Sequence, residues 1–331
     1  TRAPSVAMSA RGADPGPRPL EAELKPLWGL AYRITGCAAD ADDIVQETVT
    51  RWLARVPEDD GRPPGPWMVR VAINLAMDVL RARRRRAYSG PWLPSPVAHG
   101  DDDGLDSLED SRSDVEARYG RLESVTLAFL TALEELGPRQ RAALLLRDVL
   151  GHSPAEVARI LDTTEGNVRV LHLRARRAMA TYERARCIPT AELRDRHRAM
   201  LERFLGCLAS QDVAGLERLL AESVRTSTDS AGKYGALRGP LAGRGPVARF
   251  YVRAAANRAA GGPRVEISTV NGLPAAVVTL ARPVRRQAPL VVIALRLDDQ
   301  GLVGTIHTIL APGKLTAASA ASADQKIRRA M

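Results

Sequence analysis

The chain has 331 residues, of which 45% are hydrophobic, and a formal net charge of +10. This length predicts two or three domains, and the apolar content excludes a wholly disordered chain, because it can offset the entropy lost on folding. Three widely spaced cysteines exclude a disulfide framework and a paired-cysteine zinc motif. Along the chain, residues 1–19 lack a secretory apolar stretch, and no later run reaches the ~20 apolar residues of a membrane helix. We therefore expect a flexible leader followed by a basic cytoplasmic protein without membrane contact.

Residues 20–88 form the first predicted domain, and their apolar spacing is that of helices. One helix opens at Ala39, where Asp40 and Asp42 complement the positive end of the helix dipole. A second helix starts near Trp67, after a loop rich in Pro and Gly, and ends in the run 81–86, where five of six residues are arginine. Such a cluster at a helix end favours contact with a polyanion.

Residues 89–121 are predicted to be a linker. They include the turn-forming sequence Trp92–Pro96 (WLPSP), and residues 101–116 hold eight acidic residues against one basic residue. A segment with this much charge and so few apolar residues does not bury a core. We expect a flexible acidic tether between two compact helical modules.

Residues 122–187 form the second predicted helical domain. Two helical segments, 127–136 and 139–150, end at Gly137-Pro138 and at Gly151. The sequence Ser153-Pro154-Ala155-Glu156 is typical of a capping box, with Pro at the first helical position. The helix that it opens ends at Leu161, and a longer one follows over 165–184. Two helices joined by a three-residue turn, the second one basic, predict a helix-turn-helix.

The helix that follows the turn has the residue types of a DNA-reading helix. Val168, Leu171, Ala175 and Met179 share one face and are expected to pack inward. The outer face carries Asn and Arg, which can bind adenine and guanine edges bidentately. We predict base contacts by Asn167 and Arg169 and phosphate contacts by Arg174, Arg176 and Arg177.

Residues 188–315 form a third predicted domain of mixed type. Two helical stretches, 191–210 and 212–221, precede alternating segments that are typical of strands, with a further helix at 246–257. The predicted strands are residues 224–228, 265–270, 275–281, 290–297 and 303–310. This order predicts an α+β domain with a curved antiparallel sheet. Residues 316–331 are expected to be a loose tail.

The blocks 40–56, 66–86 and 153–180 together resemble regions two and four of a bacterial extracytoplasmic-function sigma factor. Four further motifs resemble the subgroup with a C-terminal SnoaL-like extension. They are WLPSP at 92–96, DSAGK at 229–233, NGLPA at 271–275 and APGKL at 311–315. The resemblance covers residues 20–315 and implies two all-α modules followed by an α+β SnoaL-like cone.

The resemblance implies that RNA polymerase core enzyme and promoter DNA are the partners. The helix near residue 44 would dock on the clamp helices of the polymerase, through Asp43, Gln46 and Glu47, while Ile44 and Trp52 fill the core of the domain. The helix 67–86 would bind the minus-ten element, and the helix-turn-helix would read the minus-thirty-five element. The residues expected to hold the melted strand are Asn74, Asp78, Arg81, Arg84 and Arg85.

For the C-terminal domain, the resemblance implies a regulatory contact with the helical modules. The residues expected in this contact are Trp92, Leu93, Pro94, Asp229, Lys233, Asn271, Gly272 and Pro274. Some SnoaL-like relatives are cyclases that use a carboxylate, and Asp229 and His307 are the titratable candidates here. Since no acid/base pair is evident, we predict a non-enzymatic protein without metal or cofactor.

Three hypotheses follow from the sequence. The first is a promoter-specificity subunit of RNA polymerase. The second is a one-component DNA-binding regulator that senses a small ligand in the SnoaL-like cup. The third is an enzyme with a DNA-binding appendage. The block 40–56 discriminates between the first two, because an ordinary regulator has no use for a clamp-docking helix.

Overall fold

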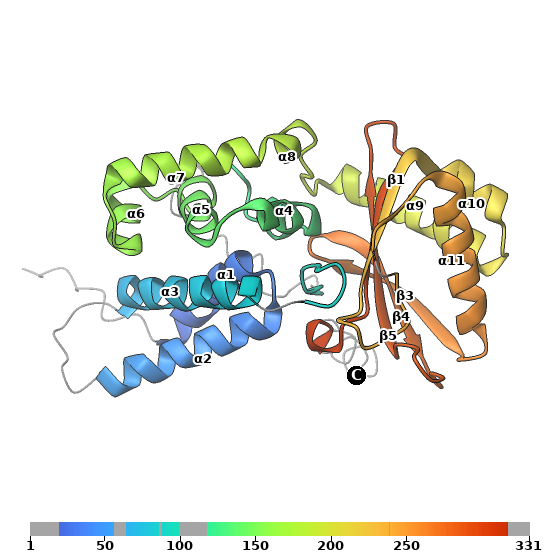
Figure 1. Cartoon of the computed structure of the whole chain (residues 1–331), viewed down its shortest axis with the longest axis horizontal. Coiled ribbons are helices and arrows are strands. Elements are labelled where there is room, and N and C mark those ends of the chain that lie inside the picture. Colours follow the sequence, from blue (N-terminus) through green and yellow to red (C-terminus); the bar gives the residue numbers. More distant parts are fainter. Residues whose placement is uncertain (1–19, 56–63, 86–87, 99–117, 238, 317–331) are drawn as a thin grey trace, which may run out of the picture.

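The computed structural model describes residues 20–55, 64–85, 88–98, 118–237 and 239–316. The predicted leader 1–19, all of the predicted tail 316–331 except Thr316, and most acidic residues of the predicted linker lie outside these ranges. Three parts follow one another along the chain (Figure 1). We call them the first helical unit (20–85), the second helical unit (118–187) and the C-terminal domain (188–316). None of the helices in the described ranges is long and apolar enough to cross a bilayer.

The first helical unit contains α1 (Leu20–Thr35), α2 (Ala38–Arg55) and α3 (Pro64–Arg85). Their apolar faces pack together, as the spacing predicts: Ile44 is 3% exposed. Trp52 is only partly buried and lies against Trp67, with ring centroids 5.6 Å apart. Ile44 therefore belongs to the unit's own core, and Trp52 packs against Trp67, which lies on that core, so the polar face of α2 is left to solvent.

The second helical unit ends in the predicted helix-turn-helix. It contains α4 (Leu127–Ala132), α5 (Pro138–Leu144), a π-helical turn (Leu145–Val149), α6 (Pro154–Leu161), α7 (Glu165–Ala178) and α8 (Ala180–Arg184). The capping box is confirmed: Glu156 N donates to Ser153 Oγ over 3.2 Å, and Ser153 N donates to the Glu156 carboxylate over 2.7 Å. The single long helix predicted for 165–184 is interrupted at Met179, whose ψ of 0° breaks the helical path.

The two helical units are not independent modules, because their buried residues form one continuous core. Arg141, which is 2% exposed, crosses between them and donates to the carbonyls of Ile34 (2.8 Å) and Leu133 (2.6 Å). Arg33 donates to Ser124 Oγ over 2.8 Å. The expected separation by a flexible tether is therefore wrong for this arrangement. Polar groups at the helix ends join the units, and local sequence patterns do not reveal such pairings.

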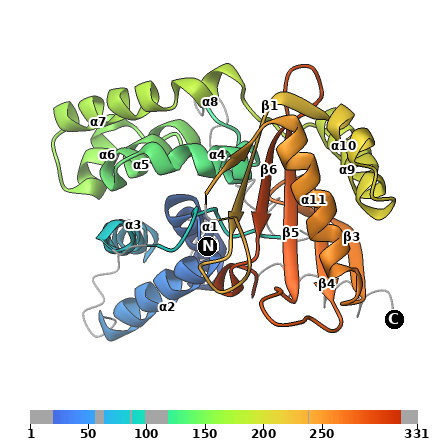
Figure 2. The same ribbon diagram turned by 45° about the vertical axis from the view of Figure 1, so that its right-hand side comes forward.

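The C-terminal domain is the predicted α+β fold. Helices α9 (Ala191–Ala209), α10 (Val213–Leu219) and α11 (Arg244–Ala259) cover one face of a six-stranded sheet (Figure 2). The strands are β1 (Leu220–Asp229), β2 (Leu241–Ala242), β3 (Pro263–Val270), β4 (Leu273–Leu280), β5 (Leu290–Leu297) and β6 (Val303–Ile309). Their order is β2-β1-β6-β5-β4-β3. The other face is turned toward the helical units (Figure 1).

The sheet departs from the prediction in one pairing. Neighbours are antiparallel except for β1 and β6, which run parallel. A parallel pair needs a long crossover, and here α11 and strands β3 to β5 supply it. The short strand β2 was not predicted, because two residues carry no detectable alternation.

The turn between β3 and β4 is the tight hairpin that its sequence predicts. Asn271 has φ +52° and Gly272 has φ +79°, the positive values that a two-residue type I′ turn requires. The turn points at the helical units: a Cβ on Gly272 would lie 3.9 Å from the carbonyl oxygen of Leu122, in the second helical unit. This hairpin therefore combines a local backbone preference with a position at the junction of the three parts.

The linker is not a free tether where the structure describes it. Residues 93–96 are buried, and Leu93 packs with Val270, Val277 and Val292 on the sheet face that looks toward the helical units. Tyr119, at the far end of the predicted linker, is 0% exposed. The expectation that residues 89–121 do not bury a core is therefore wrong at both ends, whereas the contact expected from Trp92, Leu93 and Pro94 lies within the buried motif or beside it.

Candidate polymerase and DNA surfaces and the linker clamp

The three candidate polymerase contacts lie together on the outer face of α2. Asp43, Gln46 and Glu47 are all exposed, and Glu47 forms an ion pair with Arg51 one turn later (2.7 Å). The neighbouring Ile44 is buried. This division between an apolar inner face and a polar outer face leaves the three side chains free to meet another protein.

The candidate minus-ten residues on α3 split into two groups. Asn74, Asp78, Arg81 and Arg85 are exposed at intervals of three or four residues, so they form one stripe along the helix. Within it, Asp78 and Arg81 form an ion pair of 2.6 Å. Arg84 is exposed as well, but it donates to the carbonyl oxygen of Leu136, in the second helical unit, over 2.5 Å.

Arg83, which the sequence grouped with the basic cluster, also holds the two units together. It donates to the carbonyl of Thr35 (2.7 Å) and to both carboxylate oxygens of Glu134 (3.0 Å each). Its guanidinium also lies 3.8 Å from the ring centroid of Trp92. A count of arginines cannot separate such a half-buried arginine, bonded to both units, from a surface cation.

The candidate readers of duplex DNA all lie on the exposed face of α7. Val168 (1% exposed) and Ala175 (0%) pack inward as predicted. Asn167, Arg169, Arg174, Arg176 and Arg177 are exposed. Arg169 pairs with Glu165 over 3.1 Å, and Asn167 donates to Thr163 Oγ1 over 2.8 Å. The helix therefore presents one outward face of amide and guanidinium groups.

Asp229, at the end of β1, binds the linker to the C-terminal domain. Its carboxylate, which is 0% exposed, accepts hydrogen bonds from Tyr88 Oη (2.6 Å), Leu93 N (2.9 Å) and Lys314 Nζ (2.6 Å). Lys314 Nζ also donates to the carbonyl of Leu93 over 2.5 Å. We call Tyr88, Leu93, Asp229 and Lys314 the linker clamp.

Trp92 packs beside the linker clamp, between two cations. Its ring centroid lies 4.0 Å from Lys314 Nζ and 3.8 Å from the guanidinium carbon of Arg83. A Cβ on Gly36 would lie 2.8 Å from the Trp92 ring, so the indole needs a glycine there. Pro94 is buried nearby, whereas Lys233 is exposed. Lys314, from the APGKL motif, pairs with Asp229, whereas Lys233, which was expected in the regulatory contact, lies at the surface.

Asn271 joins all three parts of the molecule. Its side-chain amide, which is 1% exposed, donates to Tyr32 Oη (2.6 Å) in the first unit and to the carbonyl of Val125 (2.7 Å) in the second. Its carbonyl oxygen accepts from Val97 N of the linker over 3.0 Å. Pro274 is buried in the same region, beside residues of the second unit. The predicted contact residues Asn271, Gly272 and Pro274 therefore meet at one junction.

The two candidate catalytic groups do not face the cup of the C-terminal domain. Asp229 belongs to the linker clamp, and His307 lines a small cavity between the sheet and the second helical unit. The large cavity between the sheet and α11 contains neither residue in its lining. The placement therefore gives no support to the hypothesis of an enzyme with a DNA-binding appendage.

We expect His307→Gln to reduce the loss of stability on acidification. Burial, together with nearby Arg296, lowers the pKa of His307 from 6.5 to about 4. As the pH falls from 6.5 to about 4, His307 binds a proton in the unfolded chain but stays neutral in the folded chain. The folded state is therefore destabilised relative to the unfolded state. Urea unfolding at pH 7 and at pH 4.5 measures the difference. An equal loss in the native chain and the variant would contradict this assignment.

Comparison with known proteins agrees with this arrangement of parts. A model of Sigma-70 region 2 matches residues 20–86, and a model of Sigma-70, region 4 matches residues 126–179. The chain is 34% identical to the ECF RNA polymerase sigma factor SigJ of Mycobacterium tuberculosis over 234 residues, 70% of each chain. It is also 34% identical to SigG of the same species over 217 residues, 60% of this chain and 58% of that one.

Likeness to a solved structure extends over all three parts. The crystal structure of the Mycobacterium tuberculosis SigJ protein matches with a TM-score of 0.68 and 30% identity, covering 90% of this chain and 97% of that one. The match to region 2 does not favour a one-component regulator, and the predicted resemblance is confirmed. The chain belongs to the extracytoplasmic-function family of RNA polymerase sigma factors.

Proposed function

We propose that this protein directs bacterial RNA polymerase core enzyme to promoters, with α2 docking on the polymerase, α3 holding the minus-ten strand and α7 reading the minus-thirty-five element. The observation that carries the proposal is the order of a region 2 match and a region 4 match along one chain, with the candidate contacts of both on exposed helix faces. The protein acts in the cytoplasm, where the polymerase works.

We further propose that the C-terminal domain regulates this activity and catalyses no reaction. In the compact arrangement, the linker clamp holds the linker on the C-terminal domain, and Asn271 forms hydrogen bonds to both helical units. Promoter elements about 25 base pairs apart are separated by roughly 85 Å at 3.4 Å per base pair. Units that share one core cannot reach both elements, so the compact arrangement must open before initiation.

Run-off transcription with purified core polymerase tests the proposal. The full-length chain should support initiation from cognate promoters, and a truncation after Arg186 should initiate at a different level, because it lacks Asp229, Lys314 and Asn271. Failure of the full-length chain to associate with core polymerase would overturn the assignment. Equal transcription by both chains would overturn the regulatory role alone.

Two substitutions on α7 should separate base reading from phosphate binding. Arg169→Ala should cost about 1–3 kcal/mol at its cognate promoter and relax preference at one position, because a base contact is sequence-specific. Arg177→Ala should weaken binding to all sequences alike and reduce the salt slope by about one. Binding of holoenzyme to duplex promoters is measured at several salt concentrations. A uniform effect of Arg169→Ala would show that this residue binds phosphate.

A further inference from the structure

A large apolar cavity lies inside the C-terminal domain, on the sheet face that α9 and α11 cover. Its volume is about 740 Å³, within the roughly 300–1,000 Å³ of sites for small organic molecules. The side chains that make it apolar include Leu205, Phe250, Val278, Val291 and Ile293. Neither the linker clamp nor the DNA-reading surface contributes to this lining, so the contacts described above do not account for the cavity.

Two polar groups in the cavity lack partners among the described residues. Thr228 is 3% exposed, and its hydroxyl makes no hydrogen bond. Arg258 leaves its buried Nε unsatisfied and donates only from Nη1 to the carbonyl of Ala254 (3.2 Å). Each buried group without a partner costs about 1–3 kcal/mol. A bound molecule that satisfied both would therefore remove a cost that the empty cavity carries.

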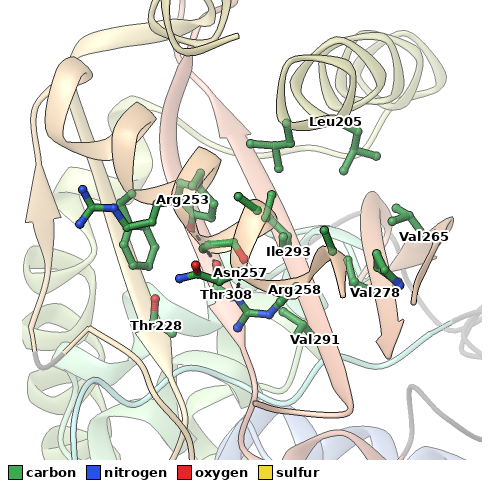
Figure 3. Close-up of a pocket in the computed structure, with 18 of the residues that line it drawn as sticks. Leu205, Thr228, Arg253, Asn257, Arg258, Val265, Val278, Val291, Ile293 and Thr308 are labelled. Atoms are coloured by element: carbon green, nitrogen blue, oxygen red, sulfur yellow. Dashed lines mark hydrogen bonds between the residues drawn. The ribbon is translucent and has the colours of Figure 1, made fainter. Parts of the chain in front are cut away.

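The charge and shape of the cavity define what it can hold. Its charged lining residues are Arg253 and Arg258, with no acidic residue in the lining that the structure describes. Figure 3 shows Thr228 and Arg258 on one side of the cavity, and the apolar Leu205 and Val265 on the other. A ligand with an anionic head and a long apolar body would therefore match the two sides of the cavity.

We propose that this cavity binds an amphiphilic monocarboxylate, with its carboxylate on Arg258 and Thr228 and its apolar body along the sheet. Burial lowers the pKa of Arg258, and a bound carboxylate would offset that loss of solvation. The rest of the lining is aliphatic and aromatic, which suits a hydrocarbon chain or fused rings.

The cavity also lies directly behind the linker clamp. Side chains alternate between the two faces of a strand, so Thr228 faces the cavity while Asp229, the next residue on β1, holds the linker. On β6, Thr308 lines the cavity, and Ile309 packs in the cluster that contains Leu93. Occupancy of the cavity is therefore coupled to the clamp through one peptide unit. This coupling, unlike the binding itself, rests on the proposed regulatory function.

Titration of the full-length chain with cis-parinaric acid, a fluorescent long-chain carboxylate, tests the binding. We expect saturable one-to-one binding that oleate displaces, with methyl oleate at least about tenfold weaker because it lacks the charge. Arg258→Met should weaken binding about tenfold or more. Thr228→Val should also weaken it without loss of thermal stability, since the hydroxyl has no partner to lose.

Arg249→Met is the matched control. Arg249 lies on the same helix, outside the cavity lining, and its Nη1 is 4.0 Å from a Glu217 carboxylate oxygen. The Arg249→Met variant should bind cis-parinaric acid with the same affinity as the native chain. Absence of saturable binding, equal displacement by the methyl ester, or an equal loss in Arg249→Met would overturn the proposed site.

A second measurement tests the coupling. Tyr88→Phe removes one hydrogen bond from the clamp and should change the affinity for oleate, because coupling between two sites is reciprocal. Unchanged affinity would overturn the coupling. Because both measurements use the free chain without polymerase, a failed titration does not affect the sigma-factor assignment, and a failed run-off experiment does not affect the binding result.

Discussion

Replacing Asp229 by asparagine should lower the free energy of unfolding by about 3–5 kcal/mol. The carboxylate is fully buried and accepts hydrogen bonds from Tyr88, Leu93 and Lys314. Removing its charge leaves the Lys314 ammonium, whose side chain is 7% exposed, without its counterion. Removing one partner of a buried ion pair costs far more than the pair contributes, because the remaining charge stays desolvated. Urea denaturation measures the change.

Two further variants make this prediction specific. Glu222 forms a surface ion pair with Arg244 over 3.7 Å, and its side chain is 94% exposed. Glu222→Gln should therefore change the free energy of unfolding by less than about 1 kcal/mol. The double variant Asp229→Asn with Lys314→Met should recover part of the loss, since no unpaired ammonium remains buried. Equal effects of Asp229→Asn and Glu222→Gln would show that the clamp contributes nothing beyond a surface ion pair.

Asn271→Asp should open the molecule. The native amide nitrogen donates to Tyr32 Oη and to the carbonyl of Val125, and an aspartate has no donor for either acceptor. It would instead place a negative charge against a backbone carbonyl, at a cost on the order of 3 kcal/mol. Because these bonds join the two helical units to the C-terminal domain, we expect a larger radius of gyration by small-angle X-ray scattering.

The backbone at this turn defines the controls. Asn271 has φ +52°, which asparagine, aspartate and glycine tolerate, so Asn271→Asp keeps the hairpin. Asn257→Asp makes the same change on an exposed residue and should leave the dimensions unchanged. If Asn271→Asp stayed as compact and as stable as the native chain, the amide would not hold the three parts together.

Local sequence predicted the elements well and their assembly poorly. The capping box at Ser153 and the hairpin at Asn271-Gly272 followed from short-range backbone preferences, and both are confirmed. The order of helices and strands followed from apolar periodicity. These features depend on residues within a few positions of one another, which is why one sequence suffices to find them.

The contacts that join the parts are of another kind. Lys314 reaches the carbonyl of Leu93 across 221 positions, and Arg141 is buried against a helix end 107 positions away. No spacing rule links such residues. The APGKL motif marked the segment around Lys314 as part of the resemblance, but only the fold shows that Lys314 pairs with Asp229. The proposed roles of the exposed residues on α2, α3 and α7 stay predictions.

The position of Arg84 has a consequence for how DNA would act on the free protein. The carbonyl of Leu136 holds the Arg84 guanidinium in one position, so a strand phosphate that bound it in another position would compete with that bond. Binding of nucleic acid to Arg84 would replace its bond to Leu136, and it would therefore favour separation of the two helical units. Linkage requires that the antagonism be mutual, and a tighter junction would therefore bind the melted strand more weakly.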